Sequence, residues 1–387
     1  MIPSFPSGAT IGSIHVAAVD LGRFASFAAS VPQIYGIRTD VANRFGLLAD
    51  AFAANVLDGV LSGSELIERH TAFPVFASLL TPESKTLWKA AQLEGDTTVW
   101  PKYFPVNPHG MAYAEHPRMC PACVHDDREQ FGIAYWRVCH QIPSVGICEV
   151  HGEILHDRCA ACGAPFPTGT RSKAPGSQCS RCGASGTSPL EKANDSAGAR
   201  SYAALIARAA QSKAPELAPE VRIRLFRRAF AGRRADEGID RLLTYWKARS
   251  LRGLETALGC KVWLPGLRRI FATGSGQAPF AVVVALVAFA AEDIGAKAVE
   301  DIIELARVDE VRLSRLDERA RQSKVLDEAL HAQARRLDLP VEVVSALLCH
   351  ETRRASELAG RLNLAVLIDL LSPEHQRSIP LWSAVSQ

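Results

Sequence analysis

Hydrophobic positions recur at helical spacing along most of the chain. Helical patterns occur near Asp40–Val60, Ser64–His70 and Pro82–Leu93, and Thr81 before Pro82 is a good helix start. From Ala197 to the end, almost every segment is an Ala/Leu/Arg-rich helical pattern interrupted by Pro and Gly. We find no convincing alternating strand pattern outside a central cysteine-rich region. The sequence therefore predicts a mostly α fold.

The longest apolar run, Ala278–Ala291, has 14 residues. This is short of the roughly 20 residues that span a bilayer, so the run predicts a buried helix and no membrane segment. No Lys or Arg precedes Arg23, and His15 interrupts the early apolar stretch, so we expect no secretory signal. The expected location is cytoplasmic. In a reducing compartment, ten cysteines indicate metal binding rather than disulfides.

The 387 residues are enough for two to four domains. A Pro-, Tyr- and His-rich connector at 96–117 and a Gly/Ser-rich linker at 183–196 suggest where they divide. We expect an N-terminal helical domain, a central double zinc-finger module with little β structure, and a C-terminal helical domain with helix-turn-helix elements. The predicted boundaries are 1–116, 117–190, 191–275 for the basic helical region, and 276–387.

Eight ligand-type residues fall into four pairs, each separated by two residues. They are Cys120/Cys123, Cys148/His151, Cys159/Cys162 and Cys179/Cys182. Two such pairs complete the tetrahedral shell of a structural Zn²⁺. The sequence therefore predicts two Zn²⁺ per chain, and Gly163 and Gly183 are placed to form the left-handed turn that often follows a cysteine pair.

The pairing of the four half-sites has two alternatives. Consecutive pairing joins the first two pairs and the last two pairs, whereas cross-braced pairing joins first with third and second with fourth. We favour consecutive pairing because each pair then closes on its nearest partner. Cys139 and His140 are not expected to form a fifth pair, because adjacent side chains diverge. His116, His125 and His156 are interpreted as surface or hydrogen-bonding residues.

The net charge of +3 hides a strongly basic segment. Residues 197–272 carry 16 Lys or Arg and 6 Asp or Glu, net +10, which is typical of contact with a polyanion. Within it, Leu251–Leu258, a Gly259 turn and Leu264–Phe271 make a helix-turn-helix candidate. The candidate nucleic-acid-binding residues are Arg224, Arg227, Arg228, Arg252, Lys261, Arg268 and Arg269.

The alternative is that these arginines form ordinary solvated helix faces. Tyr245, Trp246 and Trp263 lie in the same segment, and their helical spacing favours core positions over base-stacking platforms. A second two-helix pattern at Ser323–His350 lies in an acidic region, so we interpret it as a packing or partner surface.

The sequence offers little for catalysis. No GxxxxGK[ST] motif occurs, so the chain is not a P-loop ATPase. A Cys-His nucleophile would have to use Cys260 or Cys349 with His350, and no orienting third group is evident. A catalytic centre of three carboxylates is not expected, because the Asp and Glu residues are scattered and no predicted strands would hold three of them together. We therefore predict that the protein is not an enzyme; a metal-dependent hydrolase is an unlikely third option.

A dense series of motifs runs from Cys120 to Cys162. It contains Cys120-Pro-Ala-Cys123, the acidic pair Asp126-Asp127 before a Gly, Tyr135-Trp136-Arg137, His140-Gln141-Ile142-Pro143, the Cys148/His151 pair and the closing Cys159/Cys162 pair. In this combination the segment resembles the TniQ/TnsD family. The chain departs from the family in having Ser144 where Gly is usual. Its opening Pro6–Ser13 is a degenerate form of the family's N-terminal segment without the Glu. The chain is also shorter than the TnsD branch, so the TniQ branch fits better.

This resemblance implies a non-catalytic adaptor of a transposon, including CRISPR-associated transposons. Such a protein couples a recognised target, either DNA or an RNA-guided Cascade-type complex, to an AAA+ transposition regulator that recruits the transposase. The basic segment would then contact DNA or guide RNA, and homodimerisation stays open. The alternative function is an autonomous, sequence-specific helix-turn-helix DNA-binding protein of the TnsD type.

Overall fold

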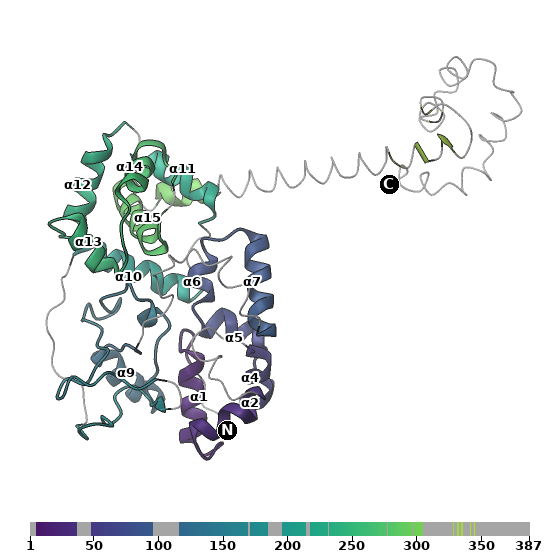
Figure 1. Ribbon diagram of the computed structural model, residues 1–387, viewed down its shortest axis with the longest axis vertical. Helices are drawn as coiled ribbons and strands as arrows, with labels where there is room; N and C mark the ends of the chain where they lie inside the picture. Colours follow the sequence, from purple (N-terminus) through teal and green to yellow (C-terminus); the bar gives the residue numbers. More distant parts are fainter. Residues whose placement is uncertain are drawn as a thin grey trace, which may run out of the picture. The chain divides into compact units, whose positions relative to one another are not determined.

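The computed structural model divides the chain into two units, Met1–Glu304 and Leu305–Gln387. The residues that it describes are 5–36, 48–95, 116–168, 171–184, 196–213, 217–230, 232–276, 278–295, 297–304 and scattered positions between 328 and 344. Helices α1–α15 all belong to the first unit (Figure 1). The pattern at Ser323–His350 and the linker between 185 and 195 lie outside the described residues, apart from those scattered positions.

Short helices form the described N-terminal part. They are α1 (Ile11–Asp20), α2 (Phe27–Tyr35), α4 (Ala49–Val56), α5 (Gly63–His70), α6 (Phe73–Ala77) and α7 (Pro82–Glu94). α5 packs against α4, α6 and α7, and α4 also contacts α2. Phe52, Leu66 and Trp88 are almost fully buried between them. Burying such large apolar side chains is the main stabilising term for helices too short to persist alone.

Local signals explain where these helices begin. Ser62 accepts a hydrogen bond from the backbone of Glu65, whose side chain bonds back to Ser62, and this reciprocal capping box starts α5. Thr81 caps α7, with Pro82 in its first turn. The predicted helices at 64–70 and 82–93 are thus confirmed. The start of the predicted helix near Asp40 lies outside the described residues.

The central module, as far as the structure describes it, has almost no regular structure. It contains α9 (Pro121–Phe131), a 3₁₀ turn η1 (Cys139–Gln141) and loops that meet at isolated β-bridges. One bridge joins Met119 to His156 and another joins Arg158 to Pro165. One of its apolar clusters contains Met119, Val124, Ala134 and Trp136, with Phe166 packed against it. Other apolar side chains of the module, such as Val138 and Ile142, are also buried.

The helices that follow the module pack on one another. They are α10 (Ala197–Ala210), α11 (Pro219–Phe230), α12 (Ala235–Tyr245), α13 (Leu251–Leu258), α14 (Leu264–Thr273) and α15 (Phe280–Ile294). α15 contacts α10, α11 and α12, and most of its apolar residues are buried. The buried helix predicted at Ala278–Ala291 is confirmed. No helix in the described residues has the length and apolar character needed to cross a membrane.

Besides its contact with α15, α10 contacts two elements that lie earlier in the chain. α10 packs against α6 and against η1 of the central module. At the second contact the hydroxyls of Ser144 and Tyr202 share a buried hydrogen bond of 2.5 Å. Ser144 is the residue that departs from the family pattern, and here it supplies the partner that a buried tyrosine hydroxyl needs. The predicted mostly helical fold with a central Cys/His module is confirmed.

Trp263 corrects the interpretation of the aromatic residues as core. Trp246 is buried as expected, but the side chain of Trp263 is 62% exposed. Trp263 is the N-cap of α14, outside the helical spacing that faces the core, whereas Leu267 and Ile270 of the same helix are buried. The local pattern therefore predicts the position of the helix correctly, but it does not predict the burial of Trp263 at the helix boundary.

Candidate metal centres

The structure brings the eight predicted ligand residues together as two groups of four. Within each group the possible ligand atoms lie within 4.8 Å of one another. The first group is Cys120, Cys123, Cys148 and His151, and the second is Cys159, Cys162, Cys179 and Cys182. This is the consecutive arrangement. Each group could hold one metal ion.

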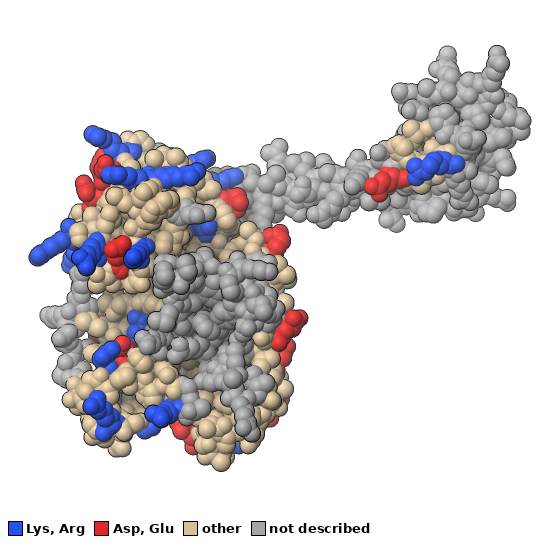
Figure 2. All heavy atoms as spheres, viewed as in Figure 1, with Lys and Arg blue, Asp and Glu red and all other residues tan. Residues whose placement is uncertain are grey.

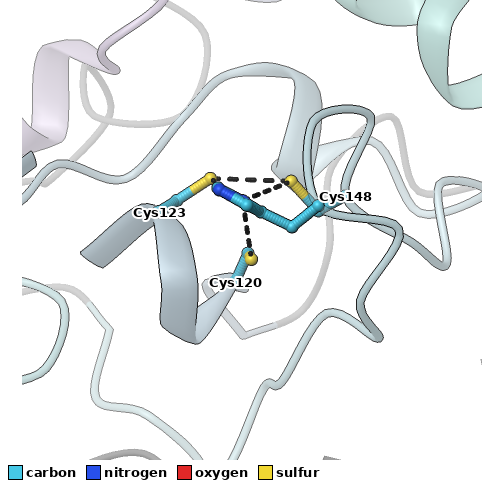
Figure 3. A group of neighbouring side chains, drawn as sticks. Cys120, Cys123 and Cys148 are labelled. Carbon is cyan, nitrogen blue, oxygen red and sulfur yellow. Dashed lines mark hydrogen bonds between the residues drawn. The ribbon is translucent and has the colours of Figure 1, made fainter. Parts of the chain in front are cut away.

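Distances in the first group match the edges of a tetrahedron. The Nδ1 atom of His151 lies 3.4 Å from the sulfur of Cys123, and the sulfurs of Cys123 and Cys148 are 3.5 Å apart. Metal–sulfur bonds of about 2.3 Å and metal–nitrogen bonds of about 2.0 Å give tetrahedral edges of ~3.6–3.8 Å. A disulfide needs about 2.05 Å, so these sulfurs are not bonded to each other. Figure 3 shows the three labelled cysteines directed toward one another, two from α9 and one from a loop.

The second group has the same spacing. The sulfurs of Cys159 and Cys182 are 3.8 Å apart, and those of Cys162 and Cys179 are 3.7 Å apart. Backbone N–H groups of Cys182 and Arg181 lower the pKa of the Cys179 thiol to about 6, because they donate hydrogen bonds to the thiolate. These backbone N–H groups therefore favour the thiolate form of Cys179, which is the form that binds a metal ion.

Three of the four ligand pairs end in a left-handed glycine. Gly152, Gly163 and Gly183 have φ of 67°, 66° and 70°. The N–H of each donates to the carbonyl of the residue four positions earlier, which is the first ligand of its pair. The left-handed turn closes the loop around both ligands, and a residue with Cβ would be strained there. The left-handed turn predicted at Gly163 and Gly183 is confirmed.

The first pair uses a helix instead of a turn. Cys120 is the N-cap of α9, and Cys123 lies one turn later with Pro121 between them. Residues three apart on a helix share a face, so both sulfurs point to the same ion position. Proline at the first helical position loses no hydrogen bond there.

A second shell of side chains holds the first group, and sequence reasoning did not assign it. The Nε2 atom of His151 lies 3.0 Å from a carboxylate oxygen of Asp126 on α9. This contact places the ring proton on Nε2 and leaves Nδ1 to face the sulfurs. Asp127, the next residue, accepts a hydrogen bond from Arg137 at 2.5 Å and from the backbone of Tyr135. The acidic pair of the motif therefore orients one ligand and anchors the following loop.

Contrary to expectation, the side chains of Cys139 and His140 do not diverge. η1 places both against Glu149, with the Cys139 sulfur 3.5 Å from one carboxylate oxygen and the His140 Nε2 atom 3.4 Å from the other. Burial raises the pKa of the Cys139 thiol well above its usual value, which keeps it protonated. For His140, burial disfavours the charged ring, but hydrogen bonds with Cys148 and Glu149 raise its pKa. The possible ligand atoms of Cys139, His140 and Glu149 lie within 4.8 Å of one another, so these three residues form a third group that could hold a metal ion, which the sequence did not lead us to expect.

Of the other three histidines, His125 fits its predicted role, whereas His116 and His156 are half-buried, and each has a ring nitrogen with no hydrogen-bond partner among the described residues. His125 is exposed and forms an ion pair with Glu129 one helical turn away. The backbone of His156 pairs with Met119 across a β-bridge. Neither ring lies in a group that could hold a metal ion among the described residues.

The candidate nucleic-acid residues are all exposed on the C-terminal helices. Arg224, Arg227 and Arg228 lie on α11, Arg252 on α13, Lys261 in the turn before α14, and Arg268 and Arg269 on α14. α11 and α14 pack side by side, and Figure 2 shows Lys and Arg atoms gathered over this end of the unit. Arg268 forms an ion pair of 3.0 Å with Asp236, and the Arg227 side chain donates to the Thr273 carbonyl.

The predicted helix-turn-helix segment is present as two helices and a turn. α13 ends at Gly259, whose φ is 64°, and α14 begins five residues later. α14 packs mainly on α11 and α12. Its exposed face carries Arg268 and Arg269, while Leu267 and Ile270 are buried.

Comparison with known proteins agrees with the motif. The sequence model of the TniQ family matches residues 56–155. The match extends from the end of α4 through the first centre and ends before Cys159. No curated protein matches the chain. Residues 56–155 therefore match a TniQ family domain.

Proposed function

We propose that the protein is a zinc-stabilised, non-catalytic adaptor that links target recognition to an AAA+ transposition regulator. The observation that carries this proposal is the TniQ domain built around the first four-ligand group. The TniQ domain indicates that the protein acts in transposition. The helices packed around the first centre would form the surface that binds a partner protein. DNA, or the RNA of a Cascade-type complex, is the proposed ligand of the basic helices.

Zinc is the ion that best fits both groups. Sets of three or four cysteines with at most one histidine are typical of structural Zn²⁺, which prefers four tetrahedral ligands. Each group already supplies four ligands, so a bound ion would have no position left for water or substrate. The chemistry that Zn²⁺ supplies here is the cross-linking of loops, and for this reason we propose no catalytic step.

The contact between Asp126 and His151 gives a test of the first site. We expect Asp126→Ala to weaken zinc binding at this site by about 10- to 100-fold, because the imidazole loses the partner that fixes its orientation. Competition with a chromophoric chelator measures the change. Glu129→Ala removes an exposed carboxylate from the same helix and should leave zinc affinity unchanged. Equal affinities in the two variants would contradict the role of Asp126.

The basic face of α11 and α14 supports binding to a polyanion. Its arginines are exposed and lie on two helices that pack against each other. Contacts with phosphates release counterions, so the affinity for nucleic acid should fall steeply with salt. Sequence-independent contact of this kind is enough for an adaptor whose target is chosen by another component.

Charge reversal tests this interaction. We expect Arg228→Glu with Arg269→Glu to reduce the slope of log affinity against log salt by about 0.9 for each duplex phosphate that the variant no longer binds. Fluorescence anisotropy with a labelled duplex and a labelled RNA strand measures it. Arg69→Glu, at an exposed position of α5 outside the basic face, serves as a control for each of the two reversals made singly. An unchanged slope in the double variant would show that these helices do not bind nucleic acid.

The alternative function is an autonomous sequence-specific DNA-binding protein. The helix, left-handed glycine and second helix at 251–273 favour it, because this arrangement can present α14 to a major groove. Tight retention of one defined duplex over a scrambled duplex, without any other component, would support the alternative. Equal retention of both duplexes would support the adaptor.

A further inference from the structure

The central module consists of two halves with opposite charge. Residues 120–157 contain two basic and six acidic residues, net −4. Residues 158–190 contain four basic residues and no Asp or Glu: Arg158, Arg171, Lys173 and Arg181. Four thiolates with one divalent ion carry −2, so the second half stays positive with its metal bound. The near-zero charge of the whole module conceals this division.

Three of these four cations surround a groove beside the second centre. The groove has a volume of about 470 Å³, and its lining includes Arg171, Lys173 and Arg181 together with Cys159 and Cys179. The three cations are exposed. No Asp or Glu appears among the described residues that line it. We call it the knuckle groove; Figure 2 shows Lys and Arg atoms on this lower part of the unit, around and beyond α9.

The walls of the knuckle groove are held in place from the first half of the module. The indole N–H of Trp136 donates to the Lys173 carbonyl at 2.8 Å, and the Arg128 side chain donates to the Gly176 carbonyl at 2.8 Å. These bonds fix the backbone of the loop that carries Arg171 and Lys173. A preformed loop loses little conformational entropy when it binds a ligand.

Lys173 in the groove and Arg158 outside it contact different kinds of group. Among the described residues, the Lys173 ammonium reaches the Gln178 carbonyl at 3.5 Å. Arg158, in contrast, lies outside the groove and forms an ion pair with Asp157 at 3.0 Å. A groove rich in exposed guanidinium and ammonium groups, with no carboxylate in its described lining, matches the charge of a phosphate backbone.

We propose that the knuckle groove binds the phosphate backbone of a nucleic-acid strand, as a site separate from the basic face of α11 and α14. The inference rests on the proposed function, in which the protein contacts DNA or RNA. It assigns the two halves of the module different partners: the basic second half contacts nucleic acid, and the acidic first half remains available to proteins.

Single charge reversals test the groove in the full-length protein. Arg171→Glu and Arg181→Glu should each lower the salt slope by about 0.9 on a labelled duplex, or about 0.7 on a single strand, and weaken binding severalfold at low salt. Arg158→Glu makes the same charge change in the same half of the module, outside the groove, and should keep the wild-type slope. Zinc content of each variant shows that the module is intact.

Neutral substitutions separate the loss of charge from a loss of folding. If a reversal lowers the zinc content, Arg171→Gln and Arg181→Gln remove the charge without reversing it and should still lower the slope. Wild-type slopes in both arginine variants, with Arg228→Glu and Arg269→Glu still effective, would overturn the groove alone. Wild-type slopes in every variant would overturn the proposed nucleic-acid function as well.

Discussion

Replacing Cys123 with serine should remove one of two zinc ions and unfold the loops around the first centre. Cys123 is 3% exposed, and its sulfur touches both His151 and Cys148 of the first centre. Serine is a poor zinc ligand, so the other three side chains would stay buried without a cation. Structural zinc sites contribute about 10–16 kcal/mol of apparent binding energy at neutral pH, which becomes folding energy. The loops around this centre have almost no regular secondary structure among the described residues, so they depend on the ion to hold them together.

Elemental analysis and thermal unfolding of the full chain measure this effect. Wild-type protein should contain two zinc ions, and the variant one, with a lower midpoint of unfolding. Cys260→Ser is the matched control, because Cys260 is half-buried and lies outside both four-residue groups. Two ions and a wild-type midpoint in the Cys123 variant would refute the assignment of the first centre.

The helices and the metal centres could be predicted because their signals are local. Apolar spacing marks α5, α7 and α15, and capping residues such as Thr81 mark where they start. Two-residue gaps bring paired ligands to one face of a turn, so the sequence alone indicates four half-sites. Which half-sites share an ion depends on contacts between residues that are far apart in the chain. Spacing alone therefore favours consecutive pairing but does not exclude cross-braced pairing.

The second shell could not be predicted because its contacts join distant residues. Asp126 meets His151 across 25 positions, and Ser144 meets Tyr202 across 58. The sequence marks Asp126 as part of the acidic pair in the motif, but it does not show that this carboxylate contacts His151. The charge division of the module is hidden for a different reason, because residues 120–182 taken as one segment hold six basic and six acidic residues.

Arg118 should be the residue outside the metal ligands whose removal destabilises the module most. Its guanidinium is buried and donates to the carbonyls of Pro143 and Val145, at 3.2 and 2.8 Å, and to that of Ile142. These carbonyls belong to the loop that carries Ser144 to α10. Arg118→Met would remove the donor of the Pro143 and Val145 carbonyls, whereas the Ile142 carbonyl would still accept from the Val145 backbone N–H. Each unsatisfied buried group costs about 1–3 kcal/mol. We expect unfolding free energy to fall by ~3–5 kcal/mol.

Denaturant unfolding of the full chain with zinc bound measures this change. Burial lowers the pKa of Arg118 to about 10, so the side chain is still charged at neutral pH and its contribution should not change between mildly acidic and neutral buffers. Arg158→Met removes an exposed cation from the same module and should cost at most about 1 kcal/mol. Because the ligands of both centres lie outside the 142–145 loop, Arg118→Met should keep two zinc ions while it loosens the packing against α10. Equal stability of the two variants would mean that the Ser144–Tyr202 bond and helix packing hold that loop without Arg118.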